Sequence, residues 1–406
     1  MRDYQRTLLP SWIGVAIALY AFIAIGIAEA GLGVLLPSIV STYHLTPATV
    51  TLLFVSQISG YILAAFTSSL VSNRLGLARM LLIAAGALTM ALTIYATSPS
   101  WFLMVAAGAE LGLGIGLIDA GINTYIVQDS RSASLIGLLH AFYGVGALLG
   151  PAIATTLLAV GMNWRQIYWV LAGIVSLLIV SVLGVIIYKY TPMTVRVSAS
   201  NTTALENLGR SLQTPIVLLS GLLLLVYVGI EACVGNWAYT VQSVARYTPT
   251  LIAGYSVSAY WLGLTLGRFI LGYFLQWLGA VRTISMSLTL TIIGLLAWWQ
   301  LPQQWISLPL IGFGLAAIFP ATIWLLPQRL PDPLVPAAVS FATSAASFGA
   351  AIVPTGAGWI ASWVGLEIIP ILMLPLALLM VGLHCWLVQH SLTYPPESNS
   401  GNSRFK

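Results

Sequence analysis

The segment Glu29-Ala-Gly-Leu-Gly33 lies in a long apolar stretch, and a related segment, Glu231-Ala-Cys-Val-Gly235, follows 202 residues later. Two further pairs recur 203 residues apart: Gly146-Ala-Leu-Leu-Gly-Pro151 with Gly349-Ala-Ala-Ile-Val-Pro354, and Asn73-x-x-Gly76-x-x-Arg79 with Gln276-x-x-Gly279-x-x-Arg282. A nearly constant offset across most of a chain indicates an internal repeat in parallel orientation. The sequence therefore predicts two related halves.

The composition places both halves in a membrane. Of the 406 residues, 59% are hydrophobic and only 6% are charged, whereas a soluble domain carries about 25% charged residues. A helix needs about 20 apolar residues to cross a bilayer. We expect an all-α membrane protein with twelve transmembrane helices in two pseudo-symmetric six-helix bundles, at 12–36, 50–71, 79–97, 102–127, 133–158, 166–188, 214–236, 250–274, 283–299, 305–326, 336–360 and 366–388.

The domain boundaries follow the polar segments. We expect a first bundle over 1–189, a cytoplasmic linker over 190–213, and a second bundle over 214–406 that ends in a short disordered tail. The first apolar stretch is too long for a signal peptide and is interpreted as a helix. Twelve of the 15 Lys and Arg residues fall on the side of the N-terminus. This bias predicts cytoplasmic termini, in the plasma membrane or, in a Gram-negative cell, the inner membrane.

Several function classes are excluded by what the sequence lacks. The basic residues lie singly between apolar runs, so they form no patch for nucleic acid. No Walker lysine motif, H-E-x-x-H metal motif or plausible nucleophile triad is present. We therefore expect neither an enzyme nor a cofactor or metal site. The expected partners are a small-molecule solute, protons and the lipid bilayer, and we expect a monomer.

The segment Ser69-Leu-Val-Ser-Asn73-Arg74-Leu-Gly76-Leu-Ala-Arg79 resembles the loop between helices 2 and 3 of the major facilitator superfamily of transporters. Ser69 stands in place of a glycine and Asn73 in place of an aspartate. Trp164-Arg165-x-x-Tyr168 is also similar to a motif of that superfamily. The resemblance implies two six-helix bundles that rock about a central site, with Arg74, Gly76 and Arg79 acting between the domains. We extend this gating and inter-domain role to Gly279 and Arg282, which match Gly76 and Arg79 in the repeat, and to Arg268.

Within the superfamily, Gly114-Ile-Gly-Leu-Ile-Asp119-Ala-Gly-Ile-Asn123-Thr-Tyr125 resembles helix 4 of the fucose:proton symporter family. This resemblance implies that Asp119 takes part in proton coupling and that Asn123 lies beside a sugar site. The segment from His140 to Tyr143 is similar to a helix whose polar residues face the sugar. Leu35-Leu-Pro37 also resembles that family, although Gly33 stands where the family commonly has an acid. Glu29 lies one turn earlier.

Five charged residues lie deep within predicted helices: Glu29, Glu110, Asp119, Glu231 and Arg268. Each costs at least about 2.5 kcal/mol to insert, so such residues usually have a function. Desolvation brings the pKa of a carboxyl group towards neutrality, which suits reversible proton binding. We assign proton coupling to Glu29, Asp119 and Glu231, and we expect Gly33 and Gly235 to leave room for a ligand. The alternative is a neutral glutamic acid bonded to a neighbouring helix.

Other polar and aromatic residues are candidates for contact with the solute. Aromatic rings with a polar atom can stack on a sugar, and Trp237 is the preferred residue of this kind. His140 is either a proton shuttle or a structural histidine. Arg268 is interpreted as snorkelling or bonding between domains, with an anion ligand or a counter-ion for Glu231 as the alternatives. The substrate-binding candidates are Gln57, Asn123, His140, Tyr143, Asn236, Trp237 and Trp324.

The leading hypothesis is a proton-coupled symporter of a small polar solute such as a sugar. A proton antiporter that exports drugs or metabolites is the first alternative, because Gly146-x-x-x-Gly150-Pro151 partly resembles an antiporter motif. Against it, Gly108 stands where drug antiporters often have an arginine. A non-transporting receptor and an intramembrane enzyme are alternatives from other classes. The receptor would be expected to carry a soluble sensing extension, and the enzyme a second catalytic aspartate.

Overall fold

The computed structural model describes residues 12–127, 132–190, 193, 209–301 and 304–391, and nearly all of them are helical. Most of the linker and the C-terminal tail expected from the sequence lie outside these residues. The first half consists of α1 (Trp12–Thr42), the short α2 (Pro47–Val50), α3 (Leu52–Leu75), α4 (Leu77–Thr97), α5 (Trp101–Val127), α6 (Ser132–Ala159) and α7 (Trp164–Ile187).

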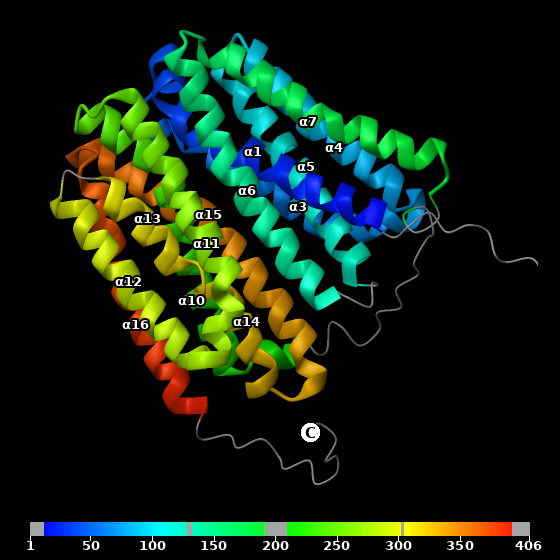
Figure 1. Cartoon of the computed structure of the whole chain (residues 1–406), viewed down its shortest axis with the longest axis vertical. Coiled ribbons are helices and arrows are strands. Elements are labelled where there is room, and N and C mark those ends of the chain that lie inside the picture. Colours follow the sequence, from blue (N-terminus) through cyan, green and yellow to red (C-terminus); the bar gives the residue numbers. More distant parts are fainter. Residues whose placement is uncertain (1–11, 128–131, 191–192, 194–208, 302–303, 392–406) are drawn as a thin grey trace, which may run out of the picture.

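The second half repeats this order (Figure 1). It consists of α10 (Pro215–Thr240) with the π-helical turn η1 (Val241–Ala245), α11 (Thr250–Leu278), α12 (Ala280–Gln300), α13 (Gln304–Leu315), α14 (Ile318–Arg329), the 3₁₀ turn η2 (Asp332–Leu334), α15 (Val335–Val364) and α16 (Ile368–Ser391).

The predicted all-helical architecture is confirmed. Eleven segments of the described chain are long and apolar enough to cross a membrane, with α13 and α14 counted as one. The twelfth crossing is α11, which has 29 residues but is rich in Ser, Tyr, Trp and Gly. Those residues lower its hydropathy without shortening it. The chain is thus a multi-pass membrane protein of two six-helix bundles.

Helix boundaries differ from the prediction at three places. α1 continues through Pro37 to Thr42, and α10 continues through η1 to Ala245, so both are longer than expected. The crossing predicted over 305–326 is broken after Leu315. Pro320 explains the break, because it lacks an N–H and its ring clashes with the carbonyl four residues earlier, on Ala316.

Glycines bring equivalent helices of the two halves into the same close packing. A Cβ atom at Gly146 would overlap the carbonyl oxygen of Ile23, so the backbones of α6 and α1 lie in direct contact there. At the matching place in the second half, a Cβ atom at Gly349 would overlap the carbonyl oxygen of Leu225, so α15 and α10 are in the same contact. Helices in lipid associate through such close contacts between small residues. The repeat seen in the sequence is therefore a repeat of backbone contacts.

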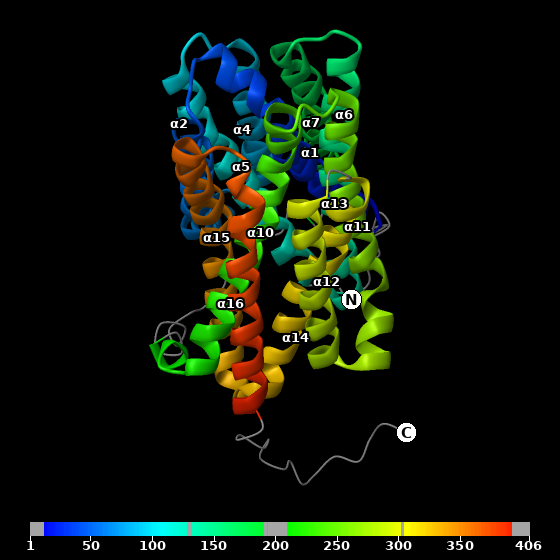
Figure 2. The same cartoon turned by 90° about the vertical axis from the view of Figure 1, so that its left-hand side faces the viewer.

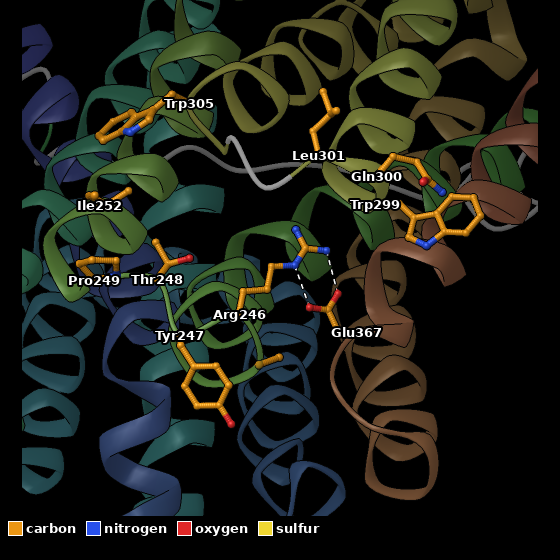
Figure 3. A pocket seen from close by; sticks show the side chains of 11 residues that line it. Arg246, Tyr247, Thr248, Pro249, Ile252, Trp299, Gln300, Leu301, Trp305 and Glu367 are labelled. Carbon is orange, nitrogen blue, oxygen red and sulfur yellow. Dashed lines mark hydrogen bonds and ion pairs between the residues drawn. The ribbon is translucent and has the colours of Figure 1, made fainter.

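An arginine joins the outer helix ends of each half, on the side away from the start of α1 and the end of α16. Arg165 donates to the Ser98 carbonyl oxygen at 2.9 Å and to the Tyr43 hydroxyl at 3.2 Å. In the second half, the corresponding arginine is Arg246, 203 residues after Tyr43. It makes a bidentate ion pair with Glu367 at 2.8 Å (Figure 3). It also donates to the Trp298 carbonyl oxygen. Each junction fixes three helix ends.

The two halves touch on this outer side. α1 crosses α10 at Gly33 and Gly235, where a Cβ atom on Gly33 would overlap the Gly235 carbonyl oxygen. We expected these glycines to leave room for a ligand, and that prediction is wrong for Gly33, because the opposite helix fills the space. The Ala48 N–H also donates to the Ser362 hydroxyl at 2.7 Å, so α2 lies beside the end of α15 (Figure 2). Toward the start of α1 and the end of α16, the bundles diverge (Figure 1).

We predict that Gly33→Ala disfavours this conformation, because the added methyl group collides with backbone that cannot move independently. Overpacking typically costs about 1–3 kcal/mol, so the outer contact should open in a larger fraction of molecules. Spin labels on His44→Cys and Trp363→Cys, in a background without Cys233 and Cys385, should report longer distances between the halves.

The matched control is Gly173→Ala, because a Cβ atom at Gly173 meets nothing within 4 Å. It should keep the distance distribution of the labelled parent. A Gly33→Ala protein that is folded and has the parent distribution would contradict the packing described here.

Candidate functional site

The first acid of the repeat, Glu29, lies midway along α1, and its hydrogen-bond partner belongs to the same half. The Tyr143 hydroxyl on α6 donates to Glu29 Oε2 at 3.0 Å. The Tyr143 ring also meets the edge of Trp261 on α11, with ring centres 6.5 Å apart and an interplanar angle of 84°. Tyr143 thus contacts an acid of the first half and an aromatic ring of the second.

The second acid, Asp119 on α5, is held by two neutral donors. The Tyr61 hydroxyl on α3 donates to Oδ2 at 2.7 Å, and the Asn123 amide donates to Oδ1 at 2.8 Å. Ser347 of α15 also interacts with the Tyr61 hydroxyl. Asn123 therefore orients the acid beside it, and Tyr61 again connects the two halves.

The third acid, Glu231 on α10, has a cation as its partner. Arg268 Nη2 lies 3.5 Å from both carboxylate oxygens of Glu231 and 3.3 Å from the Tyr227 hydroxyl. Because α11 continues to Leu278, Arg268 is ten residues from the end of its helix, too deep for simple snorkelling. The structure favours the counter-ion interpretation of Arg268 over snorkelling.

These groups share one region between the bundles. Glu231 and Asp119 both lie close enough to Glu29 to interact with it electrostatically. His140 interacts in the same way with Asp119 and Arg268, and it contacts the Phe22 ring edge at 5.8 Å. His140 is exposed although it lies eight residues inside α6, on the part of that helix nearer the diverging side. The site thus combines three carboxyl groups with one guanidinium among the described residues.

The repeat places Glu29 and Glu231 symmetrically, but their partners are asymmetric. The position that matches Arg268 in the first half is Ala65, 203 residues earlier. The position that matches Tyr143 in the second half is Ala346. Glu29 therefore has a neutral tyrosine and no ion pair among the described residues, whereas Glu231 has an arginine. The two acids can play different chemical roles.

The remaining predicted substrate-binding residues differ in their exposure and in their hydrogen bonds. Gln57 and Asn236 are partly exposed, and neither side chain has a hydrogen bond within the described chain. Trp324 on α14 is 51% exposed. Trp237, our preferred stacking residue, is 1% exposed, donates its indole N–H to the Pro354 carbonyl oxygen at 3.0 Å, and meets Phe54 across the halves. In this conformation Trp237 packs the outer contact and offers no ring face to a solute.

The loop residues expected to act between domains form two matched turns. Gly76 follows α3 with φ 85°, and Gly279 follows α11 with φ 74°. This left-handed region strongly favours glycine. Arg74, Arg79 and Arg282 are exposed, and none forms an ion pair with a described residue. Their role in gating stays a prediction.

An open hollow of about 780 Å³ lies at the outer end of the second half, away from the three acids. Arg246 and Glu367 form part of its wall, with the half-exposed Trp299 and Trp305 nearby (Figure 3). Arg246 is already fully engaged by Glu367 and the Trp298 carbonyl. The polar groups in the wall of this hollow therefore serve to join helix ends.

Tyr61 and Trp261 were not predicted from the sequence. The available signal for Tyr61 was its position four residues after Gln57 on one helical face. Trp261 is 5% exposed, and its indole N–H has no partner among the described residues, which leaves one donor for a solute or water. The described residues include no cluster of three His, Cys, Asp or Glu suited to a metal ion.

Comparison with known proteins decides the family. A sequence model of the Major Facilitator Superfamily matches residues 18–308 and 248–405. The chain belongs to the Major Facilitator Superfamily. It is therefore a transporter of small-molecule solutes and not an enzyme.

Individual relatives within the superfamily are distant. The chain is 25% identical to "Bypass of stop codon protein 6" of Saccharomyces cerevisiae, over 91% of this chain and 81% of that protein. It is 23% identical to the glucose/mannose transporter GlcP of Bacillus subtilis, over 83% and 85%. A bacterial homologue of the human lysosomal transporter Spinster, inward-facing and unoccupied, has the same fold, with a TM-score of 0.76, 13% identity and coverage of 95% and 98%.

We predict that Glu231→Gln destabilises this superfamily member, because Arg268 would keep a charge without its counter-ion. Breaking a buried ion pair typically costs about 3–5 kcal/mol, and the 3.5 Å separation favours the lower end. The double variant Glu231→Gln/Arg268→Gln should recover much of that loss. The free energy of unfolding in mixed micelles measures both effects.

Arg282→Gln is the control, since Arg282 is exposed and has no ion pair with a described residue. It should unfold like the wild type. If the double variant lost as much stability as the two single variants together, the pairing of Glu231 with Arg268 would be refuted.

Proposed function

We propose that the protein is a proton-coupled symporter of a small polar solute, such as a sugar, that works by alternating access. The observation that supports this proposal most strongly is a contrast between the acids. Glu29 and Asp119 accept hydrogen bonds from neutral donors, whereas Glu231 forms an ion pair with Arg268. An acid at membrane depth that has no cation beside it can take up a proton and leave no uncompensated charge. Glu29 and Asp119 are thus the proton carriers, and Glu231 stays ionised.

The orientation follows from the positive-inside rule. The excess of Lys and Arg lies on the side of the termini, which assigns that side to the cytoplasm. The bundles diverge on the same side and touch on the other (Figure 1). The conformation described here is then open to the cytoplasm, and the carrier acts as a monomer in the plasma membrane or the inner membrane.

The solute class rests on the free polar groups near the acids. Gln57, Asn236 and the Trp261 indole provide uncharged donors and acceptors, which suit hydroxyl groups. The resemblance of helix 4 to the fucose:proton symporter family and the relation to a glucose/mannose transporter both support a sugar. Export of drugs in exchange for protons is the second candidate, because Gly146, Gly150 and Pro151 partly match the antiporter motif.

We predict that purified protein in proteoliposomes concentrates a member of a sugar panel only when the entry side is acidic. Glu29→Gln and Asp119→Asn should each abolish accumulation but retain exchange of solute across the membrane, because a neutral amide mimics the protonated acid. Glu110→Gln is the control on α5, since Glu110 has no hydrogen bond with a described residue. It should accumulate solute like the wild type.

The same experiment separates the alternatives. Solute movement that ignores the pH gradient would exclude proton coupling. Gradient-driven exit of drugs or metabolites would support the antiporter. Specific binding without movement in sealed vesicles would support a receptor.

A further inference from the structure

Two tyrosines stand between the acids of the first half and the surface of the second. Tyr143 donates to Glu29 and packs on Trp261, and Tyr61 donates to Asp119 and interacts with Ser347. Both tyrosines are peculiar to the first half, because the matching positions of the second half hold Ala346 and Leu264. The repeat alone gives no structural reason for either hydroxyl.

The α6–α11 contact beside Tyr143 is tight. A Cβ atom at Gly144 would overlap the Thr265 hydroxyl, so the α6 backbone lies directly against α11. Thr156 and Tyr255 also join these helices by a hydrogen bond of 2.9 Å between their hydroxyls. A change in the direction of the Tyr143 ring therefore acts on a packed interface between the halves.

We propose that Tyr143 and Tyr61 are positioning residues that transmit the state of Glu29 and Asp119 to the contact between the halves. The inference rests on the proposed proton coupling. A hydrogen bond to an ionised carboxylate is about twice as strong as one to a neutral acceptor. An ionised acid thus holds its tyrosine in the orientation that packs on the second half, and protonation releases it.

A solute hydroxyl that donates a hydrogen bond to the same carboxylate would compete with the tyrosine for it. Solute binding would then release the tyrosine, as protonation does. Proton and solute would then both weaken the same inter-half contacts, and two ligands that favour the same transition are coupled. This gives each tyrosine a part in symport without direct contact with the solute.

Other charged groups face this network and contribute to its pH response. Glu231 and Asp119 interact electrostatically with Glu29, and Glu231 and Arg268 interact electrostatically with Tyr143. Glu29 interacts in the same way with Tyr61, and His140 does so with Asp119. Variants that change only the tyrosine hydroxyls leave all these charges in place, which makes them the sharpest test.

The test uses Tyr143→Phe and Tyr61→Phe in the full chain, which keep both rings and remove the donors. Spin labels on Asn73→Cys and Ser340→Cys, in a background without Cys233 and Cys385, report the separation of the bundles across a pH series. In the labelled parent, low pH should shift molecules out of the open state. Each variant should reduce this pH-dependent change in the open-to-closed ratio by about 2- to 12-fold, the factor that one net hydrogen bond supplies.

Tyr95→Phe is the matched control, because the Tyr95 hydroxyl is buried in the first half without a hydrogen-bond partner among the described residues. It should keep the parent pH response. In a Glu29→Gln background, adding Tyr143→Phe should change the pH response no further, since both substitutions remove the same charge-assisted bond.

The outcomes separate this inference from the proposed function. If the parent responds to pH and both phenylalanine variants respond equally, the tyrosine inference fails while proton coupling stands. If the parent does not respond to pH and its solute transport ignores a pH gradient, proton coupling and the tyrosine inference fail together. An additional loss from Tyr143→Phe in the Glu29→Gln background would also overturn the assigned route.

Discussion

The contact of α1 with α10 at Gly33 and Gly235 determines the geometry of everything near the midplane. Glu29 and Glu231 each lie one helical turn before these glycines. Because backbone meets backbone at the crossing, the two acids are brought together across the axis that relates the halves. A larger residue at Gly33 would separate the helices, and with them the carboxyl groups that interact there.

Asymmetry in the partners converts this symmetric frame into a site with distinct roles. Arg268 neutralises Glu231 within the second half, and Ala65 at the matching position provides no cation for Glu29. A charge in a membrane interior requires a partner or a proton. The same acid, repeated once, therefore has a fixed counter-ion in one half and a neutral tyrosine in the other.

The sequence predicted the halves, the crossings and the acids because each leaves a local or periodic signal. Apolar length marks a crossing, and the 202- to 203-residue offset marks the repeat. The roles of Gly33, Trp237 and Tyr61 depend on which faces of distant helices meet, and no local pattern in one sequence records that. The break before α14 was a partial exception, since Pro320 was visible but Pro37 and Pro151 lie in unbroken helices.

The central claim is that Glu29 and Asp119 exchange protons while Glu231 remains ionised. Infrared difference spectra across a pH titration test it most directly, because a protonated carboxyl group has a carbonyl band that a carboxylate lacks. We predict that the titrating band loses intensity in Glu29→Gln and in Asp119→Asn. It should keep its intensity in Glu231→Gln, where only its midpoint moves because Glu231 interacts electrostatically with Glu29. A band that persists in both Glu29→Gln and Asp119→Asn, or disappears in Glu231→Gln, would contradict the account.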